Sequence, residues 1–158
     1  MAKEKPFVKA STGDGQYKYL ETSILSSSPE ELIVKCMDIA ILFAKKGLEK
    51  IRTGGASYAT MDIAGISDAL IRSQNALTLL MGSLNFEIGG DLAQNLFRLY
   101  EWWHHELVMA NMEKQSARIE TILPHMVTMR ETWAEAVRKF RLERRQQRDT
   151  SALAGLSA

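Results

Sequence analysis

The chain has 158 residues, of which 46% are hydrophobic and 25% are charged, and its formal net charge is +1. A chain of this size can bury a full core without a disulfide or a metal ion, and its near-neutral charge argues against a nucleic acid as the partner. Cys36 is the one cysteine, which excludes an internal disulfide and fits a reducing cytoplasm. The N-terminus lacks the apolar stretch of a secretory signal peptide, and no apolar run is long enough for membrane insertion.

Four long segments with helical spacing, separated by short breaks, predict an all-α fold. Strand-like alternation is absent, and breaks this short favour antiparallel neighbours. We therefore expect an antiparallel up-and-down bundle of four long helices, preceded by a short N-terminal helix or extended segment. The expected organisation is a flexible N-terminal segment over residues 1–16, a helical-bundle domain over 17–146 and a flexible C-terminal tail over 147–158.

The first predicted helix runs from Pro29 to about residue 52 and begins at a clear cap. Ser28 and Glu31 have the spacing of a capping box, and Pro29 occupies the first helical position, where its missing N–H has no cost. A glycine pair at residues 54–55 ends the helix.

This first helix is apolar over an arc of roughly 220°, whereas an ordinary surface helix needs little more than 100°. One face begins at Ile33, and a second face consists of Leu32, Cys36, Ile39 and Phe43. Two interpretations stay open. Either this is the central helix of the bundle, or one flank is an open groove for an amphipathic helix of another chain.

The other three helices are predicted over about residues 59–85, 91–111 and 114–146. In each, apolar residues recur at every third or fourth position. "FEIGG" at 86–90 separates the second helix from the third, and Asp91 suits the positive end of a helix dipole.

Candidate catalytic and metal-binding groups are few. Glu101 and His104 have the i, i+3 spacing of a ferritin-like metal site, but the second Glu-x-x-His that such a site needs is absent from the sequence. Cys36 lies in an apolar stretch, which favours a buried, unreactive thiol. We predict no catalytic residue, no metal ligand and no cofactor.

The basic run "RKFRLERRQQR" at 138–148 has two interpretations. Such a run is typical of a surface for nucleic acid or membrane, or of a solvated helix end. The interleaved Glu143, the interleaved apolar residues and the near-neutral total charge favour the solvated helix end.

Several motifs in order resemble a known family. The first are "SSSPEELI" at 26–33 and "MDIAI" at 37–41, with Tyr19 ten residues before the proline. The longest is "SLNFEIGGDLAQNLFRLYEWW" at 83–103, and "LVMANMEK" and "MRETW" follow it. Together they resemble the signature of the flagellin-specific export chaperones, the FliS family, over about residues 17–136.

This resemblance implies a cytoplasmic chaperone that binds the disordered C-terminal segment of flagellin, prevents its premature polymerisation and assists its type III export. It also implies the flagellar export gate and a co-chaperone as further partners. The client-binding residues expected from it lie before and along the first helix and on the third: Tyr19, Ile24, Leu32, Cys36, Ile39, Phe43, Asn95, Leu99 and Trp103.

The sequence departs from the family pattern at Cys36 and Met37, where the family has leucine and tyrosine. These departures bear on the shape of the binding surface and so on the client. The alternatives are a chaperone or co-chaperone of the same fold for a different flagellar export client, and a metal-dependent bundle enzyme that uses Glu101 and His104.

Overall fold

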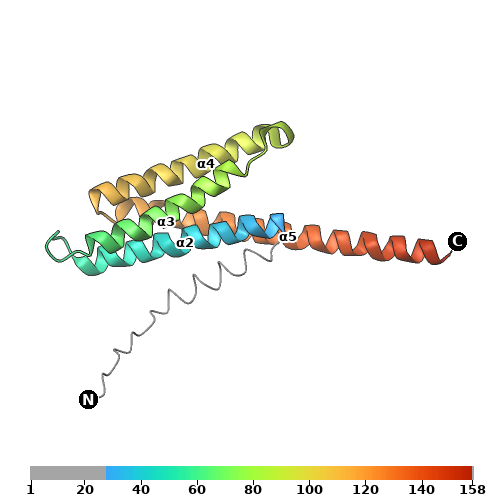
Figure 1. Ribbon diagram of the computed structural model, residues 1–158, viewed down its shortest axis with the longest axis horizontal. Helices are drawn as coiled ribbons and strands as arrows, with labels where there is room; N and C mark the ends of the chain where they lie inside the picture. The colour runs from blue at the N-terminus through green and yellow to red at the C-terminus, as the bar shows by residue number, and fades with distance from the viewer. Residues whose placement is uncertain (1–27, 158) are drawn as a thin grey trace, which may run out of the picture.

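The computed structural model describes residues 28–157, which form four helices and no strand. The helices are α2 (Pro29–Gly54), α3 (Ile63–Gly82), α4 (Phe86–Glu113) and α5 (Ala117–Leu156). Successive helices run in opposite directions and lie side by side (Figure 1). The predicted all-α helical bundle is confirmed. The predicted N-terminal helix or extended segment lies outside the described residues.

The four helices close into a ring. α2 packs against α3 and α5, and α4 packs against the same two helices from the other side. The core between them comes from the apolar stripe of every helix, which is the arrangement that short connections impose on a bundle. Its largest fully buried side chains are Ile66, Leu70, Leu77, Leu80, Tyr100, Trp103, Leu107, Ile119, Ile122 and Met126.

The start of α2 is fixed by the predicted capping box. The Glu31 N–H donates to Ser28 Oγ at 3.4 Å, and the Ser28 N–H donates to Glu31 Oε2 at 3.1 Å. Both bonds satisfy amides that a helix N-terminus otherwise leaves unpaired. The cap therefore fixes which residues of α2 face the bundle.

The face of α2 that begins at Ile33 is the core face, as predicted. Met37, Ala40, Ala44 and later residues of this face are buried, and Ile33 itself is half-buried against the core. At Gly47 the helix approaches α3 so closely that a Cβ atom would lie 2.9 Å from Leu70 Cγ. Only a residue without a side chain allows this contact.

α4 begins at Phe86, earlier than predicted, and a break separates its first turn from the rest of the helix. Gly90 has φ 49° and ψ −127°, a backbone that glycine adopts readily and other residues rarely do. The continuous part of α4 thus begins at Asp91, the residue that the sequence indicated. The extra turn before it is started by the Asn85 side chain, which accepts from the N–H groups of Glu87 and Ile88.

α5 is longer than predicted. The helix was expected to end near residue 146, but it continues to Leu156. No proline follows residue 124, and glutamine, alanine and leucine after 146 are residues that tolerate a helix well. Beyond Val137 every described residue of α5 is exposed, and the C-terminal part of the helix projects past the rest of the bundle (Figure 1).

Candidate functional site

Two adjoining apolar cavities lie at the end of the bundle where α2 and α4 begin and α3 ends. The first, between α2 and α3, has a volume of about 340 Å³, and the second, between α2, α3 and α4, has about 230 Å³. They share Ile33, Leu80 and Ser83 in their walls. We call the two together the apolar groove.

α2 and α3 supply the walls of the first cavity, whereas all four helices contribute to the second, with Trp133 from α5. The first cavity is lined by Pro29, Glu30, Leu32, Ile33, Cys36, Leu79, Leu80 and Ser83. The second is lined by Ile33, Leu80, Ser83, Leu84, Asn85, Ile88, Gly89, Leu92, Ala93, Leu96, Tyr100 and Trp133.

The rim of the groove exposes large aliphatic side chains to water. The exposed fractions are 66% for Leu79, 87% for Ile88 and 65% for Leu92. Single exposed apolar residues are common on protein surfaces, but several gathered around one hollow mark a binding surface. The groove therefore has the composition of a site for apolar side chains of another chain.

Local backbone features hold the α4 wall of the groove in place. The Asn85 carboxamide oxygen accepts from the Ile88 N–H at 3.1 Å, which fixes the turn that carries Ile88. At Gly89 a Cβ atom would lie 2.7 Å from Ala93 Cβ, so this turn folds closely onto the following one. The wall is thus set by the glycine pair of "FEIGG" and by one side-chain cap.

The titratable groups of the groove are few. A hydrogen bond with the Ser28 side chain lowers the pKa of Glu30 at the edge of the first cavity, whereas Cys36 and Tyr100 favour their neutral forms. Burial raises the pKa of the Cys36 thiol. Burial also raises the pKa of the Tyr100 phenol, and the neighbouring Trp133 indole partly offsets that rise. The Trp133 indole N–H has no acceptor in hydrogen-bond geometry among residues 28–157. Apart from Glu30, such a surface selects partners by shape and apolar contact.

The structure brings only part of the predicted site together. Leu32 and Cys36 both line the first cavity. Ile39 and Leu99 are half-buried against the core and line neither cavity. Tyr19 and Ile24 lie outside the described residues. The role of these residues in client binding stays a prediction.

Phe43, Asn95 and Trp103 lie elsewhere. Phe43 is buried between α2 and α3, where the Lys46 ammonium and the Arg72 guanidinium lie over its ring. Asn95 is exposed on α4 and lines neither cavity. Trp103 is 1% exposed and belongs to the core, beside Tyr100. A client in the groove would not reach Trp103 unless the core opened.

Leu79, Ile88 and Trp133 line the groove but were not predicted to bind a client. Leu79 lies off the apolar stripe of its helix, and this was a usable signal, because a core-facing helix does not need the extra leucine. Ile88 lies in "FEIGG" at 86–90, which was interpreted only as a break between helices. Leu92 has the helical spacing of the third predicted helix, yet the structure exposes it at the groove.

Within residues 28–157, no three His, Cys, Asp or Glu side chains are grouped so that they could hold a metal ion. Glu101 is exposed and His104 is half-buried on α4. No helix in this range combines the length and the apolar character needed to cross a membrane.

A four-helix bundle with an apolar groove at one end is typical of a protein that binds amphipathic segments of other chains. Comparison with known proteins agrees with this class. The model of the family described as "Flagellar protein FliS" matches residues 13–140. The flagellar secretion chaperone FliS of Salmonella typhimurium is 27% identical over 120 residues, which cover 73% of this chain and 82% of that protein.

The chain belongs to the FliS family. Its resemblance to that family, based on motifs in three of the four helices, is confirmed, and membership classes it with the flagellar secretion chaperones. This is a family of chaperones and not of enzymes.

Proposed function

We propose that the protein is a cytoplasmic chaperone that binds the disordered C-terminal region of flagellin in the apolar groove. Binding there would keep flagellin from polymerising prematurely and would assist its type III export. Family membership and the resemblance to a flagellar secretion chaperone support the general role. The observation that carries the proposal is the groove itself, with Leu79, Ile88 and Leu92 exposed around it.

The properties of the groove suit a client that must later be released. A disordered segment loses conformational entropy when it folds onto a surface, so its affinity is lower for a given buried area. The groove offers the client apolar contacts and few ionic ones, and such contacts tolerate small changes in the packing of the client. The client would then be bound with moderate affinity and could be released at the export gate.

A calorimetric titration with a peptide from the flagellin C-terminus tests the proposal. The wild-type protein is compared with Leu79→Ala in the groove and with Leu153→Ala on the projecting part of α5. Both leucines are 66% exposed, so neither substitution opens the core. Leu153 therefore serves as a matched control outside the groove.

The expected loss follows from the exposed area. Complete burial of a leucine is worth about 1.5–3 kcal/mol, and about two thirds of Leu79 remains to be buried, so its truncation should cost about 1–2 kcal/mol. This corresponds to an affinity roughly 5- to 30-fold lower. Leu153→Ala should bind as wild type does.

Two results would overturn the proposal. Equal affinity of Leu79→Ala and Leu153→Ala, with both proteins folded by circular dichroism, removes the groove as the site. Binding to another flagellar export client, without binding to flagellin, replaces the client and favours a chaperone of the same fold with a different substrate.

A further inference from the structure

The projecting part of α5 carries an arginine-rich face. Residues 138–148 contain six basic residues and one acidic residue, so this short segment has a net charge of +5 in a chain whose total is +1. At 100° per residue, its five arginines fall within an arc of about 120°. We call this surface the arginine face: Arg138, Arg141, Arg144, Arg145 and Arg148.

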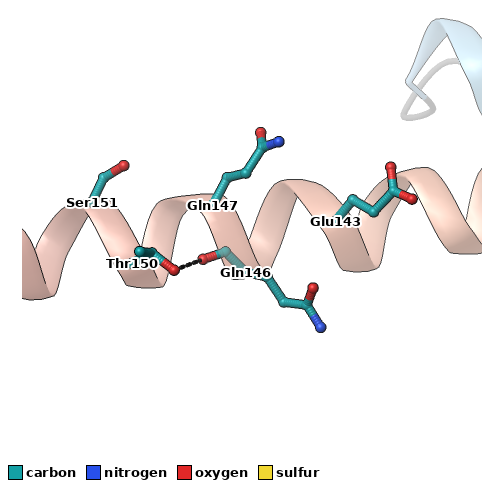
Figure 2. A pocket seen from close by; sticks show the side chains of 5 residues that line it. All are labelled: Glu143, Gln146, Gln147, Thr150 and Ser151. Atoms are coloured by element: carbon teal, nitrogen blue, oxygen red, sulfur yellow. Dashed lines mark hydrogen bonds between the residues drawn. The ribbon is translucent and has the colours of Figure 1, made fainter.

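The opposite side of the same helix is polar and carries one acidic residue, Glu143, and one basic residue, Lys139. Figure 2 shows Glu143, Gln146, Gln147, Thr150 and Ser151 on this stretch of α5, with the Thr150 hydroxyl donating to the Gln146 carbonyl oxygen at 2.8 Å. A solvated helix end usually distributes its charges around the helix. Here five of the six cations of residues 138–148 lie on one side, which is typical of a binding surface.

The arginine face has a hollow beside it. A cavity of about 310 Å³ is lined by Ser28 and Glu30 at the start of α2 and, on α5, by Phe140, Arg141, Arg144, Arg145 and Arg148. The Arg144 guanidinium lies over the Phe140 ring, with 5.6 Å between the guanidinium carbon and the ring centroid. The hollow thus combines fixed positive charge with one aromatic surface.

Most of this charge is not neutralised within the described residues. Arg141 forms an ion pair with Glu31 of α2. Arg138, Arg145 and Arg148 have no salt-bridge partner among residues 28–157. Three arginines on one side of a helix are therefore available to an anion from outside this part of the chain.

We propose that the arginine face binds an acidic peptide segment of a second protein, separate from the client in the apolar groove. Arginine forms paired hydrogen bonds with carboxylates, and the Phe140 ring offers a contact for one apolar residue of the same peptide. The face is about 15 Å long, the span of roughly five residues of extended chain.

Two features favour a peptide over a phosphate polymer or a lipid surface. Glu30 lines the same cavity and Glu31 lies beside it, so a long polyanion that extended past the arginines would meet carboxylates. A short acidic segment can stay on the arginines alone. The apolar residues of projecting α5 are also too few for membrane insertion, because Gln146 and Asp149 separate Leu142 from Leu153 on that stripe.

The test uses the full chain and a fluorescent peptide of about twelve residues, rich in Asp and Glu with one central leucine. Arg145→Gln/Arg148→Gln removes two positive charges from the arginine face. Gln146→Glu/Gln147→Glu changes the net charge by the same amount on the opposite side of the helix and is the matched control. Fluorescence anisotropy is measured at about 50 mM and about 300 mM salt.

We expect saturable, salt-sensitive binding by the wild type and an affinity lower by about tenfold or more in Arg145→Gln/Arg148→Gln. The control variant should lose less than about threefold, because its added charges lie away from the peptide. Affinity for the groove client should be the same in all three proteins.

Several outcomes would overturn the proposal. The first is no saturable binding of the acidic peptide by the wild type, and the second is an equal loss of peptide affinity in both variants. The third is a loss of groove-client affinity in Arg145→Gln/Arg148→Gln, which would assign the arginine face to the client site. Tighter binding of a single-stranded RNA, or of vesicles of phosphatidylcholine and phosphatidylglycerol, than of the acidic peptide would show that the class of partner is wrong.

Discussion

Gly47 provides a sharp test of the packing between α2 and α3. It lies in the middle of α2, where alanine has a higher helix propensity by about 1 kcal/mol, so propensity alone predicts that Gly47→Ala stabilises the protein. The structure predicts the opposite. An added Cβ would lie 2.9 Å from Leu70 Cγ and closer still to Leu70 Cδ2.

Leu70 cannot move away easily, because its side chain is completely buried. Overpacking of this kind costs about 1–3 kcal/mol, and a clash below 3 Å belongs at the upper end of that range. After subtraction of the propensity gain, Gly47→Ala should lower the free energy of unfolding by about 1–2 kcal/mol. The melting temperature should fall by roughly 2–8 °C.

A double-mutant cycle separates packing from propensity. Leu70→Ala alone should cost about 2–5 kcal/mol, because it leaves a cavity. In that background Gly47→Ala meets no clash and should stabilise by about 1 kcal/mol, so the coupling between the two sites should be about 2–3 kcal/mol. The assay is urea unfolding followed by circular dichroism at 222 nm. Stabilisation by Gly47→Ala in the wild-type background, or additive effects in the cycle, would refute the close approach of the two helices.

Two further predictions concern titrating groups. Burial raises the pKa of Cys36, so iodoacetamide should modify this thiol more slowly at pH 8 than it modifies the same cysteine in urea. A groove client should slow the reaction further. Mass spectrometry gives the rates, and modification of the folded protein at the rate of the unfolded one contradicts the burial. The Lys50 ammonium, which donates to Asp62 at 2.7 Å, lowers the pKa of that carboxyl, as does the Gly65 N–H. A lowered folded pKa gives stability that is present above the unfolded pKa and is lost as the pH falls below about 4. Asp62→Asn keeps the helix cap and should therefore be less stable than wild type at pH 7 but equally stable near pH 2, as measured by thermal melts. A difference in stability that is constant with pH contradicts the lowered pKa of Asp62.

The helices and the core were largely predictable because they follow from local signals. The capping box at Ser28, the break at "FEIGG" and the apolar spacing of each helix act over a few residues, and the structure contains all of them. The end of α5 was predicted wrongly because that helix projects into solvent. No described residue beyond Val137 packs on the core and no proline follows Pro124, so neither packing nor a breaker ends the helix near residue 146.

The groove was harder to predict because it depends on where neighbouring helices end. Leu32 and Phe43 lie on the same face of α2 in a helical projection, yet Leu32 lines a cavity and Phe43 is buried. At Phe43 the chain of α3 lies alongside, as the position of Arg72 over the ring shows. At Leu32 only the last turn of α3 remains, with Leu79 and Ser83. Periodicity gives the direction of a side chain but not the length of the neighbour that covers it.

The anchoring of α2 explains why the groove does not close on itself. Its first half is tied to α5 by two ion pairs, Glu31 with Arg141 and Asp38 with Arg130, the second with N–O distances of 2.7 and 3.2 Å. These pairs lie on the side of α2 away from the groove and hold the helix against α5. If α2 moved to cover Leu79 on α3, it would have to break them.

The excess of apolar residues in α2 therefore serves two different surfaces of one helix. From Met37 onward the helix supplies the core, and before it Leu32 and Ile33 face a hollow that is already formed. If a disordered client binds there as proposed, a preformed hollow spares the protein most of the ordering entropy of binding, and the main entropic cost falls on the client. Affinity can then be adjusted through the exposed rim without disturbing the packing that keeps the bundle folded.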